Sequence, residues 1–356
     1  MTKLLSNATT HIPPMNSLER DNIFFQAEAV AWLRHRMQLQ PDWFLLCDTN
    51  TRLHCLPLFE TLFGTVPNSR LIVMPAGEAH KQLETAEAIW RQLQLSGARR
   101  DSLLMNLGGG VVCDLGGFAA ATWKRGIPFI HIPTTLMAQT DAAIGGKCAL
   151  NFGGIKNQIG LIRQPEAVCI LPDFLKSLPQ QEIHAGFAEM LKHGIIADAD
   201  LFRTLRQEDS RIPPDIVHIR RSVEIKMSFV RQDEEDRDVR KALNFGHSVG
   251  HLLEALAGGS LSHGKAVAYG MRAEANIAWR QGLLNTSDWE EITQCIQQHY
   301  GDTPAITCSR EELVRLLSAD KKSDAASLNF SLPTAIGQVR TNCPVAFDEV
   351  WVTLHS

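Results

Sequence analysis

Several features are missing from this 356-residue sequence, and each absence argues against a class of protein. No apolar run reaches membrane-spanning length, and the opening residues lack the long apolar core of a signal peptide. The net charge of -4 leaves no basic stripe, so we expect no nucleic-acid partner and no membrane partner. The 8 cysteines form no CxxC pair, which is typical of reduced thiols in the cytoplasm rather than of disulfides or a zinc knuckle.

The first half of the chain alternates apolar runs with helical patterns. Because strands that alternate with helices form parallel sheets covered by helices, we predict an α/β fold here. Residues before about Asn22 are expected to form an irregular arm. The predicted strands are 43–47, 70–74, 102–107, 129–132 and 167–171, and the predicted helices are 28–39 and 83–93.

The pattern changes near Leu178 and Pro179, beyond which it is helical. Since 356 residues exceed one ordinary core, we predict an α/β domain over 1–179 and a helical domain over 180–356. Residues 327–340 could hold a short strand pair or an ordered loop. The helix candidates in this half are 180–196, 215–230, 240–256, 264–281 and 287–299.

Three glycines, 108–110, directly follow the strand predicted at 102–107. Glycine permits a sharp turn and a close backbone approach, and a helix that starts behind such a turn can bind an anion. We expect that helix to start in the small-residue segment 116–122, after Asp114. A tight turn that serves packing alone is the alternative, and the GxGxxG fingerprint is absent. Thr134 and Thr135 end the next predicted strand, so together these features favour a nucleotide or phosphate site.

The helical half contains residues that could bind a divalent metal. His247 and His251 are four residues apart and share a helix face, as do Glu189 and Lys192. His263 follows a pair of glycines. A carboxylate and imidazoles can hold a metal with one position open. Spacing alone favours His247 and His251 as joint ligands, although HExxH is absent and each histidine could instead be a surface or core residue.

Eight lysines and arginines stand out, although a single cation usually lies on a solvated face. Lys147 and Lys192 have less polar neighbours than the others, which favours a functional role, whereas Lys241 and Lys265 are expected at the surface. The eight are Arg125, Lys147, Lys156, Lys192, Lys226, Arg240, Lys321 and Lys322.

Five motifs carry a resemblance to a known family: GGGVVCDLGGFAAATWKRG, IPTTLMAQTDAAIGGK, IKNQIG, GFAEMLKHG and RKALNFGHSVGH, the last followed by HG at His263. Over about residues 43–340 the chain resembles the 3-dehydroquinate synthase family of the shikimate pathway. The resemblance implies a Rossmann-like NAD-binding α/β domain followed by a helical domain that binds metal and substrate. It also implies a tightly held NAD, a zinc or cobalt ion, a sugar phosphate substrate and a homodimer.

The resemblance also implies individual roles, beginning with Glu189, His247 and His263 as metal ligands. It therefore moves His251 from the metal site to the substrate pocket, as a proton-transfer residue. Arg125 resembles an arginine that the family lends across a dimer to the substrate phosphate. The implied NAD contacts are Asp48, Ala76, Gly77, Glu78, Ala79, His80, Lys81, Gly110, Val111, Val112, Cys113, Asp114, Thr134, Thr135, Asp141, Lys147, Lys156, Phe174, Leu175, Lys176 and Ser177. The implied substrate contacts are Asp141, Lys147, Asn157, Lys192, Lys226, Arg240, Asn244, His251 and one of Lys321 or Lys322.

The sequence departs from the family pattern at three positions. Cys148 stands where threonine is usual, Trp123 where tyrosine is common, and Lys265 where an acid is frequent. None is an inferred metal ligand or substrate contact, but Cys148 puts the local nucleotide geometry in doubt.

The implied reaction converts 3-deoxy-D-arabino-heptulosonate 7-phosphate to 3-dehydroquinate through transient oxidation by NAD, β-elimination of phosphate and an aldol closure. Three alternatives stay open at this point. Another sugar phosphate cyclase would share the NAD and metal motifs, although Lys226, Arg240 and Asn244 together favour a substrate with a carboxylate. A metal-dependent alcohol dehydrogenase would form NADH, and a binding protein would be inactive.

Overall fold

The structure is a computed structural model that describes residues 18–304, 308–320 and 328–355. Its N-terminal half is built on a six-stranded sheet in which every neighbouring pair of strands is parallel. The strand order is β1-β8-β5-β4-β2-β3. The predicted parallel sheet is therefore confirmed, and only the three-residue β1 was not anticipated. The strands are β1 Ile23–Phe25, β2 Trp43–Asp48, β3 Leu71–Met74, β4 Leu103–Gly108, β5 Phe129–Pro133 and β8 Ala167–Ile170.

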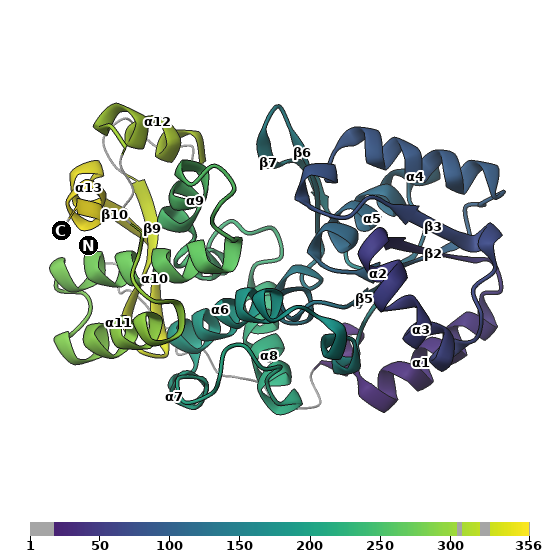
Figure 1. Cartoon of the computed structure of the whole chain (residues 1–356), viewed down its shortest axis with the longest axis horizontal. Coiled ribbons are helices and arrows are strands. Elements are labelled where there is room, and N and C mark those ends of the chain that lie inside the picture. Colours follow the sequence, from purple (N-terminus) through teal and green to yellow (C-terminus); the bar gives the residue numbers. More distant parts are fainter. Residues whose placement is uncertain (1–17, 305–307, 321–327, 356) are drawn as a thin grey trace, which may run out of the picture.

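Helices cover both faces of this sheet (Figure 1). Phe44 and Leu46 of β2 pack with α4 and α5 on one face, while Leu45 and Cys47 pack with α1 and α3 on the other. Successive side chains of a strand point to opposite faces, so a continuous apolar run fits a sheet that is covered twice. The helices here are α1 Gln26–Leu39, α2 Thr49–His54, α3 Leu56–Phe63, α4 Leu83–Leu95 and α5 Gly110–Thr122.

Short helical turns join several of these elements. Helix α5 starts at Gly110, the last of the three glycines, rather than in the segment 116–122 where the sequence suggested a start. The short turns are η2 Glu19–Asp21, η3 Asn68–Arg70, η4 Glu78–His80, η5 Trp123–Arg125, η6 Ala138–Ala142 and η7 Pro172–Ser177.

An antiparallel hairpin, β6 Lys147–Phe152 and β7 Ile155–Ile162, stands apart from the main sheet. Figure 1 shows it projecting between the two halves of the molecule, near α9. Strand β6 packs on α5, whereas nearly all of β7 is exposed. The sequence did not predict this hairpin, because a strand exposed on both faces has neither an apolar run nor an alternating pattern.

The C-terminal half is mainly helical, as predicted, and of the segment 327–340 left open by the sequence, the described residues 328–340 belong to a strand pair. Strands β9 Leu328–Ala335 and β10 Gln338–Val345 are antiparallel. The helices are α6 Gln180–Ala197, α7 Ala199–Leu205, α8 Ile216–Gln232, α9 His247–Leu256, α10 His263–Arg280, α11 Thr286–Tyr300, α12 Arg310–Asp320 and α13 Phe347–His355. Among the described residues, no helix is both long and apolar enough to cross a membrane.

The single helix predicted at 240–256 is wrong. The chain forms a 3₁₀ turn, η8 Val239–Asn244, and then breaks at Gly246, whose φ of 80° is left-handed, before α9 begins. The buried carboxylate of Glu274 accepts the backbone N–H of Gly246 at 2.7 Å and that of Val249 at 2.9 Å. Glu274 thus satisfies two amides at the start of α9, which stabilises the break.

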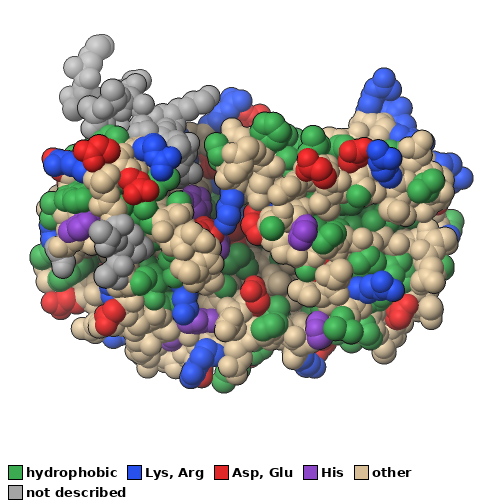
Figure 2. Space-filling model, turned by 45° about the horizontal axis from the view of Figure 1, so that its top comes forward, with side chains coloured by type: hydrophobic (Ala, Val, Ile, Leu, Met, Phe, Trp, Pro, Cys, Tyr) green, Lys and Arg blue, Asp and Glu red, His purple; other side chains and the backbone are tan. Residues whose placement is uncertain are grey.

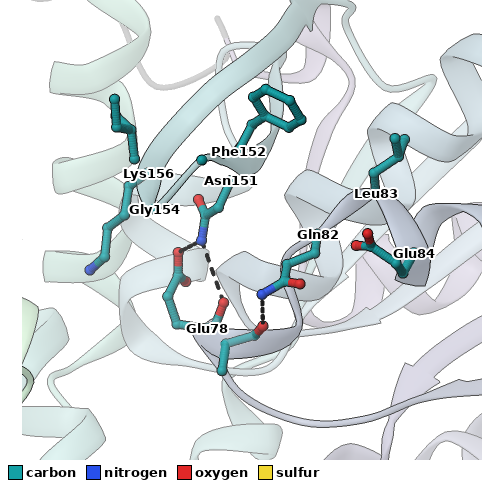
Figure 3. A pocket seen from close by; sticks show the side chains of 11 residues that line it. Glu78, Gln82, Leu83, Glu84, Asn151, Phe152, Gly154 and Lys156 are labelled. Carbon is teal, nitrogen blue, oxygen red and sulfur yellow. Dashed lines mark hydrogen bonds between the residues drawn. The ribbon is translucent and has the colours of Figure 1, made fainter.

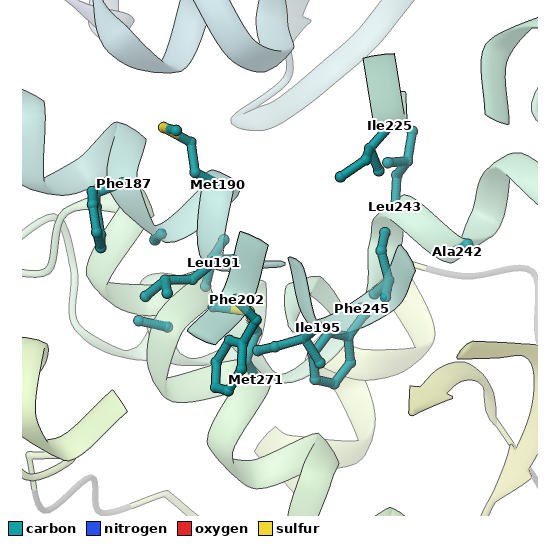
Figure 4. Packing of buried hydrophobic residues seen from close by; sticks show 14 of the residues in the cluster. Phe187, Met190, Leu191, Ile195, Phe202, Ile225, Ala242, Leu243, Phe245 and Met271 are labelled. Carbon is teal, nitrogen blue, oxygen red and sulfur yellow. The ribbon is translucent and has the colours of Figure 1, made fainter. Parts of the chain in front are cut away.

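The largest hydrophobic cluster continues across the predicted boundary at residue 179. It includes Phe25 and Val168 from the sheet as well as Phe187 and Phe245 from the helical half. Figure 4 shows the helical part of this packing, with Phe187, Phe202 and Phe245 among the buried side chains. The two halves therefore share a core, and the boundary itself stays a prediction.

Candidate active site

Three potential metal ligands from three helices converge in the C-terminal half. Glu189 lies in α6, His247 is the first residue of α9, and His263 is the first residue of α10. One ligand atom from each lies within 4.8 Å of the others. His247 Nε2 is 3.5 Å and His263 Nε2 is 3.9 Å from Glu189 Oε1. One carboxylate and two imidazoles suit a zinc-type site with an open position.

Glycines allow these three helices to approach closely. A Cβ added at Gly264 would lie 2.3 Å from the backbone oxygen of Ala185 in α6. A Cβ at Gly270 of α10 would lie 1.9 Å from the backbone oxygen of Gly246. Because real Cβ atoms cannot come so near to backbone, both positions require glycine, and the close packing sets the spacing of the three ligands.

Both histidines are oriented to offer Nε2 to a metal. His247 Nδ1 lies 3.3 Å from the carbonyl oxygen of Phe245, and His263 Nδ1 lies 3.3 Å from Glu254 Oε2. An Nδ1–H that donates to such an acceptor leaves a lone pair on Nε2 in the neutral ring. These residues therefore fit a divalent metal at the position that Glu189 also faces.

The charges around Glu189 favour its ionised form. Burial alone would raise its pKa, but Lys192 and the neighbouring histidines outweigh burial and hold the pKa well below the usual range. Burial, with a contribution from Lys192, lowers the pKa of His247 to about 4. At neutral pH the site therefore offers an anionic carboxylate and a neutral imidazole, as a metal requires.

His251 lies beside this group without belonging to it among the described residues. Its ring centroid is 5.4 Å from that of His247 and 5.9 Å from that of His263. The structure thus gathers the set that the resemblance implied, and not the pair His247 and His251 that spacing alone favoured. Spacing within one helix could not show this set, because its three ligands lie on three different helices.

A second group, Asp141, Glu189 and His193, also brings three ligand atoms together. It is less suited to a metal, because Lys226 Nζ lies 2.6 Å from Asp141 Oδ1 and already neutralises that carboxylate. Burial would raise the pKa of Asp141, but Lys226 and Lys192 outweigh burial and lower it. We interpret this group as a network that orients Asp141.

Buried cations surround the metal group. Lys192 forms an ion pair with Glu189, and both side chains are 1% exposed. Arg240 is buried, with its guanidinium donating to the carbonyl oxygens of Gly145 at 2.9 Å and Glu234 at 2.7 Å. These cations would attract an anionic ligand to the space beside Glu189.

The implied NAD contacts of the N-terminal half follow the carboxyl ends of parallel strands. Asp48 ends β2, and Thr134 and Thr135 follow β5. Segment 76–81 follows β3, segment 110–114 follows β4, and segment 174–177 lies in η7 after β8. Ligands of open α/β sheets bind at this edge.

The two interpretations of the glycine turn both find support. A Cβ at Gly108 would lie 2.4 Å from Val112 Cβ, and one at Gly109 would lie 2.9 Å from Thr135 Cγ2, so packing alone requires glycine. No side chain caps the start of α5 within the described structure, which leaves its first amides available for an anion. Asp114, four residues into this helix, pairs with Lys81 at 2.5 Å.

The hairpin meets both halves of the site. Asn157 accepts a hydrogen bond from Lys81 at 2.5 Å, Lys147 pairs with Asp236, and Lys156 pairs with Glu254 of α9. A pocket lies between the hairpin tip and the segment 78–84 (Figure 3). Figure 3 also shows the Asn151 amide donating to Glu78, at 2.9 Å to Oε1.

Figure 2 shows a hollow near the middle of one face, between the two halves, with basic, acidic and histidine side chains along it.

Arg125 does not lie with the metal ligands and the buried cations in this chain. It is exposed and has a left-handed φ of 70°, and its side chain forms no hydrogen bond or ion pair with a described residue. Lys321 and Lys322 lie outside the described residues. Cys148 is buried against Gly117 of α5, so it serves packing.

Two residues of the site were not anticipated from the sequence. His193 is fully buried beside Asp141, and Glu254 contacts both His263 and Lys156. Glu254 could have been found, because it lies seven residues after His247 and three after His251 on the same helix face. His193 follows Lys192 directly and gave no separate signal.

Comparison with known proteins identifies the family. The profile described as 3-dehydroquinate synthase N-terminal matches residues 71–185, and the one described as 3-dehydroquinate synthase C-terminal matches residues 186–323. The chain belongs to the 3-dehydroquinate synthase family. It is 37% identical over 323 residues to the 3-dehydroquinate synthase of Parabacteroides distasonis, covering 87% of this chain and 90% of that protein. It is 41% identical over 291 residues to that of a Synechocystis species, covering 79% and 81%.

Solved structures share the fold at lower identity. A 2-deoxy-scyllo-inosose synthase complexed with carbaglucose-6-phosphate, NAD+ and Co2+ aligns with a TM-score of 0.81 and 22% identity, covering 93% of this chain and 95% of that chain. The 2-epi-5-epi-valiolone synthase of Streptomyces hygroscopicus, with NAD+ and Zn2+ bound, aligns with a TM-score of 0.77 and 24% identity, covering 94% and 95%. An iron-containing alcohol dehydrogenase from Thermococcus thioreducens aligns at 0.61 and 16% identity, covering 94% and 97%. The fold is thus common to cyclases and dehydrogenases.

Proposed function

We propose that this chain is a 3-dehydroquinate synthase, a lyase that converts 3-deoxy-D-arabino-heptulosonate 7-phosphate to 3-dehydroquinate and phosphate. The observation that carries the proposal is the convergence of Glu189, His247 and His263 beside the buried cations Lys192 and Lys226. A metal next to several fixed positive charges suits a substrate that carries hydroxyls, a carboxylate and a phosphate. Family membership supports the same assignment.

Glu189, His247 and His263 would hold a zinc or cobalt ion, and the strand-end residues from Asp48 to Ser177 would hold NAD. When bound, NAD supplies a reversible hydride acceptor, and the metal supplies a Lewis acid for the reacting hydroxyl and ketone. Because the oxidation is later reversed, the net reaction releases phosphate and leaves no NADH. The solved cyclases that contain NAD+ with Co2+ or Zn2+ support this pair of cofactors.

The chain's own residues would bind and orient the substrate. Lys147, Lys192, Lys226 and Arg240 offer positive charge to the carboxylate and phosphate, while Asn157 and Asn244 can bond to hydroxyls. Asp141, paired with Lys226 at 2.6 Å, would accept a hydroxyl hydrogen bond. Holding both anionic ends keeps the intermediate ketone in place until the ring closes.

His251 is the best candidate for proton transfer. A ring nitrogen of imidazole can accept or donate a proton, and the His251 ring lies next to those of His247 and His263. His251 could therefore hold or move a proton beside the site that Glu189, His247 and His263 would offer to a metal. Substrate phosphate can serve as its own base during the elimination, so no second protein base is required.

We also propose a cytoplasmic homodimer in which Arg125 reaches the partner's site. An exposed arginine in a left-handed backbone conformation, unpaired among the described residues, is a costly arrangement that suits a functional contact. Mixing inactive Arg125→Ala protein with inactive Lys192→Met protein should restore part of the activity. Full activity in a monomer at sedimentation equilibrium would exclude the dimer.

The proposed cytoplasmic location is supported by the cysteines, since all eight are free thiols.

The choice among cyclases is tested by the substrate. We expect phosphate release from the heptulosonate phosphate in the presence of NAD and Co²⁺, and little release from sedoheptulose 7-phosphate or glucose 6-phosphate, which lack the carboxylate. Replacing Lys226 with Met should weaken use of the heptulosonate phosphate most. Faster release from either of the other sugar phosphates would exclude the proposed substrate.

A further inference from the structure

Glu254 of α9 joins two parts of the candidate site that come from different halves of the chain. Its carboxylate is only 14% exposed. Oε1 accepts a hydrogen bond from Lys156 Nζ of the hairpin at 2.5 Å, and Oε2 lies 3.3 Å from Nδ1 of His263. In Figure 1 the hairpin lies between α9 and the half of the molecule that holds the main sheet. One side chain therefore contacts both the hairpin and an inferred metal ligand.

The contact with His263 decides which ring nitrogen is free. An ionised carboxylate can only accept hydrogen bonds, so Nδ1 must carry the proton in this contact. The neutral ring then presents the lone pair of Nε2, which lies 3.9 Å from Glu189 Oε1 in the metal group. A carboxylate behind a histidine ligand is a common device for fixing ring orientation and raising ligand basicity.

The contact with Lys156 links the hairpin to the same carboxylate. Strand β7 is exposed along nearly its whole length, so few side-chain contacts hold the start of this strand against the rest of the molecule. Those contacts include the pair of Lys156 with Glu254 and the hydrogen bond from Lys81 to Asn157. A shift of Glu254 would therefore alter both the orientation of His263 and the position of the hairpin.

We propose that Glu254 is a positioning residue that orients His263 for metal binding and couples the metal site to the hairpin through Lys156. The inference rests on the proposed metal site of Glu189, His247 and His263. It adds that metal binding restrains the hairpin, because an oriented Glu254 holds Lys156. Loss of the Lys156 contact would therefore remove the restraint that metal binding exerts on the hairpin.

The test compares Glu254→Ala, Glu254→Gln and Lys156→Met with wild type, using Glu290→Gln as a matched control. Glu290 is an exposed glutamate of α11 outside the site. Co²⁺ affinity is measured by competition with a chelator in the absence of NAD and substrate, and the visible absorption of bound Co²⁺ is recorded. Amide hydrogen exchange of residues 147–162 is then measured with and without Co²⁺.

We expect Glu254→Ala to bind Co²⁺ about 10–100-fold more weakly, as is usual when the partner of a histidine ligand is lost. Glu254→Gln keeps an acceptor for Nδ1, so its loss should be smaller, with a shifted Co²⁺ spectrum. Co²⁺ should slow exchange of the hairpin in wild type and Glu290→Gln, and should not do so in Glu254→Ala or Lys156→Met. If the alanine variant does not fold, the glutamine variant must show the shifted spectrum and the faster hairpin exchange.

Equal Co²⁺ affinity in wild type and Glu254→Ala would overturn the role in positioning His263. Slowing of hairpin exchange by Co²⁺ in Lys156→Met, as large as in wild type, would overturn the coupling. Wild-type protein that binds no Co²⁺ would instead overturn the proposed metal site, and this inference with it. The failure of the inference and the failure of the proposed function are thus distinguishable.

Discussion

The two sides of the candidate site are held together by different means. In the helical cluster, which consists of Glu189, Lys192, His247 and His263, the ion pair of Glu189 with Lys192 is only 1% exposed. On the hairpin, Lys147 and Lys156 are 52% and 49% exposed and pair with partners from the helical half. A buried pair is sensitive to the loss of either member, whereas exposed pairs contribute about 0–1 kcal/mol.

This difference indicates which parts of the site exist before ligands bind. The helical cluster is fixed by helix packing, so its geometry belongs to the folded protein itself. The hairpin cations can exchange their present carboxylate partners for ligand anions at small cost. Substitutions in the helical cluster should therefore change stability or metal binding, and those on the hairpin should change ligand binding with little effect on stability.

The largest effect is expected for Lys192→Met. This change leaves the Glu189 carboxylate buried without its cation, which typically costs about 3–5 kcal/mol of unfolding free energy. Urea unfolding of the metal-free protein at neutral pH measures the loss. A loss below about 1 kcal/mol would mean that the pair behaves like a surface pair and that the comparison fails.

Replacing His263 with Ala should remove the metal and most of the activity. The side chain is one third exposed, so the fold should survive, and NAD binding by the other half should persist. Loss of a Lewis acid removes several kcal/mol of transition-state stabilisation, so activity should fall at least about a hundredfold. Full metal occupancy of the variant by elemental analysis would show that His263 is not a ligand.

His193 should make stability depend on pH. Burial lowers its pKa to about 3, while the unfolded residue keeps a pKa near 6.5. Below pH 6.5 His193 binds a proton in the unfolded chain but not in the folded chain. The unfolding free energy therefore decreases as the pH is lowered, by up to about 1.4 kcal/mol per pH unit, until about pH 3.

In the variant His193→Gln the unfolding free energy should depend less steeply on pH, because the contribution of His193 to the slope is lost. The other buried histidines contribute equally to both proteins. Unfolding measured at about pH 7 and about pH 5 gives the difference. Parallel curves for the two proteins would show that His193 has the same pKa in the folded and unfolded states, which would contradict the prediction.

The smallest change in stability is expected for Lys147→Met. Its pair with Asp236 is half exposed, so the unfolding free energy should fall by less than about 1 kcal/mol. Turnover of the heptulosonate phosphate should nevertheless fall, because a cation that faces the ligand is lost. A large loss of stability with unchanged turnover would reverse the assignment of the two sides.

The central sheet could be predicted from the sequence because strands such as β4 are buried on both faces and form continuous apolar runs. The hairpin could not, since exposed β7 carries no periodic signal. The break before α9 depends on Glu274, which lies 28 residues after Gly246 in the sequence. Within 240–256 only Gly246 hints at a break, and nothing in that segment indicates the distant partner Glu274.

The candidate site was predictable only in part. Spacing within one helix brought His247 and His251 together, but a metal group built from three helices depends on tertiary packing. The resemblance supplied Glu189 and His263, because motifs preserve the order of such residues without showing their geometry. Neither approach indicated Glu254, whose role depends on contacts with Lys156 and His263 at once.

The most direct test of the proposed function follows phosphate and NADH in the same reaction. Wild-type protein is mixed with NAD, Co²⁺ and 3-deoxy-D-arabino-heptulosonate 7-phosphate, and the absorbance of reduced nicotinamide is recorded while phosphate is released. We predict many turnovers of phosphate release with no accumulation of NADH beyond the amount of enzyme. NADH formation that matches phosphate release mole for mole would contradict the synthase assignment and indicate a dehydrogenase.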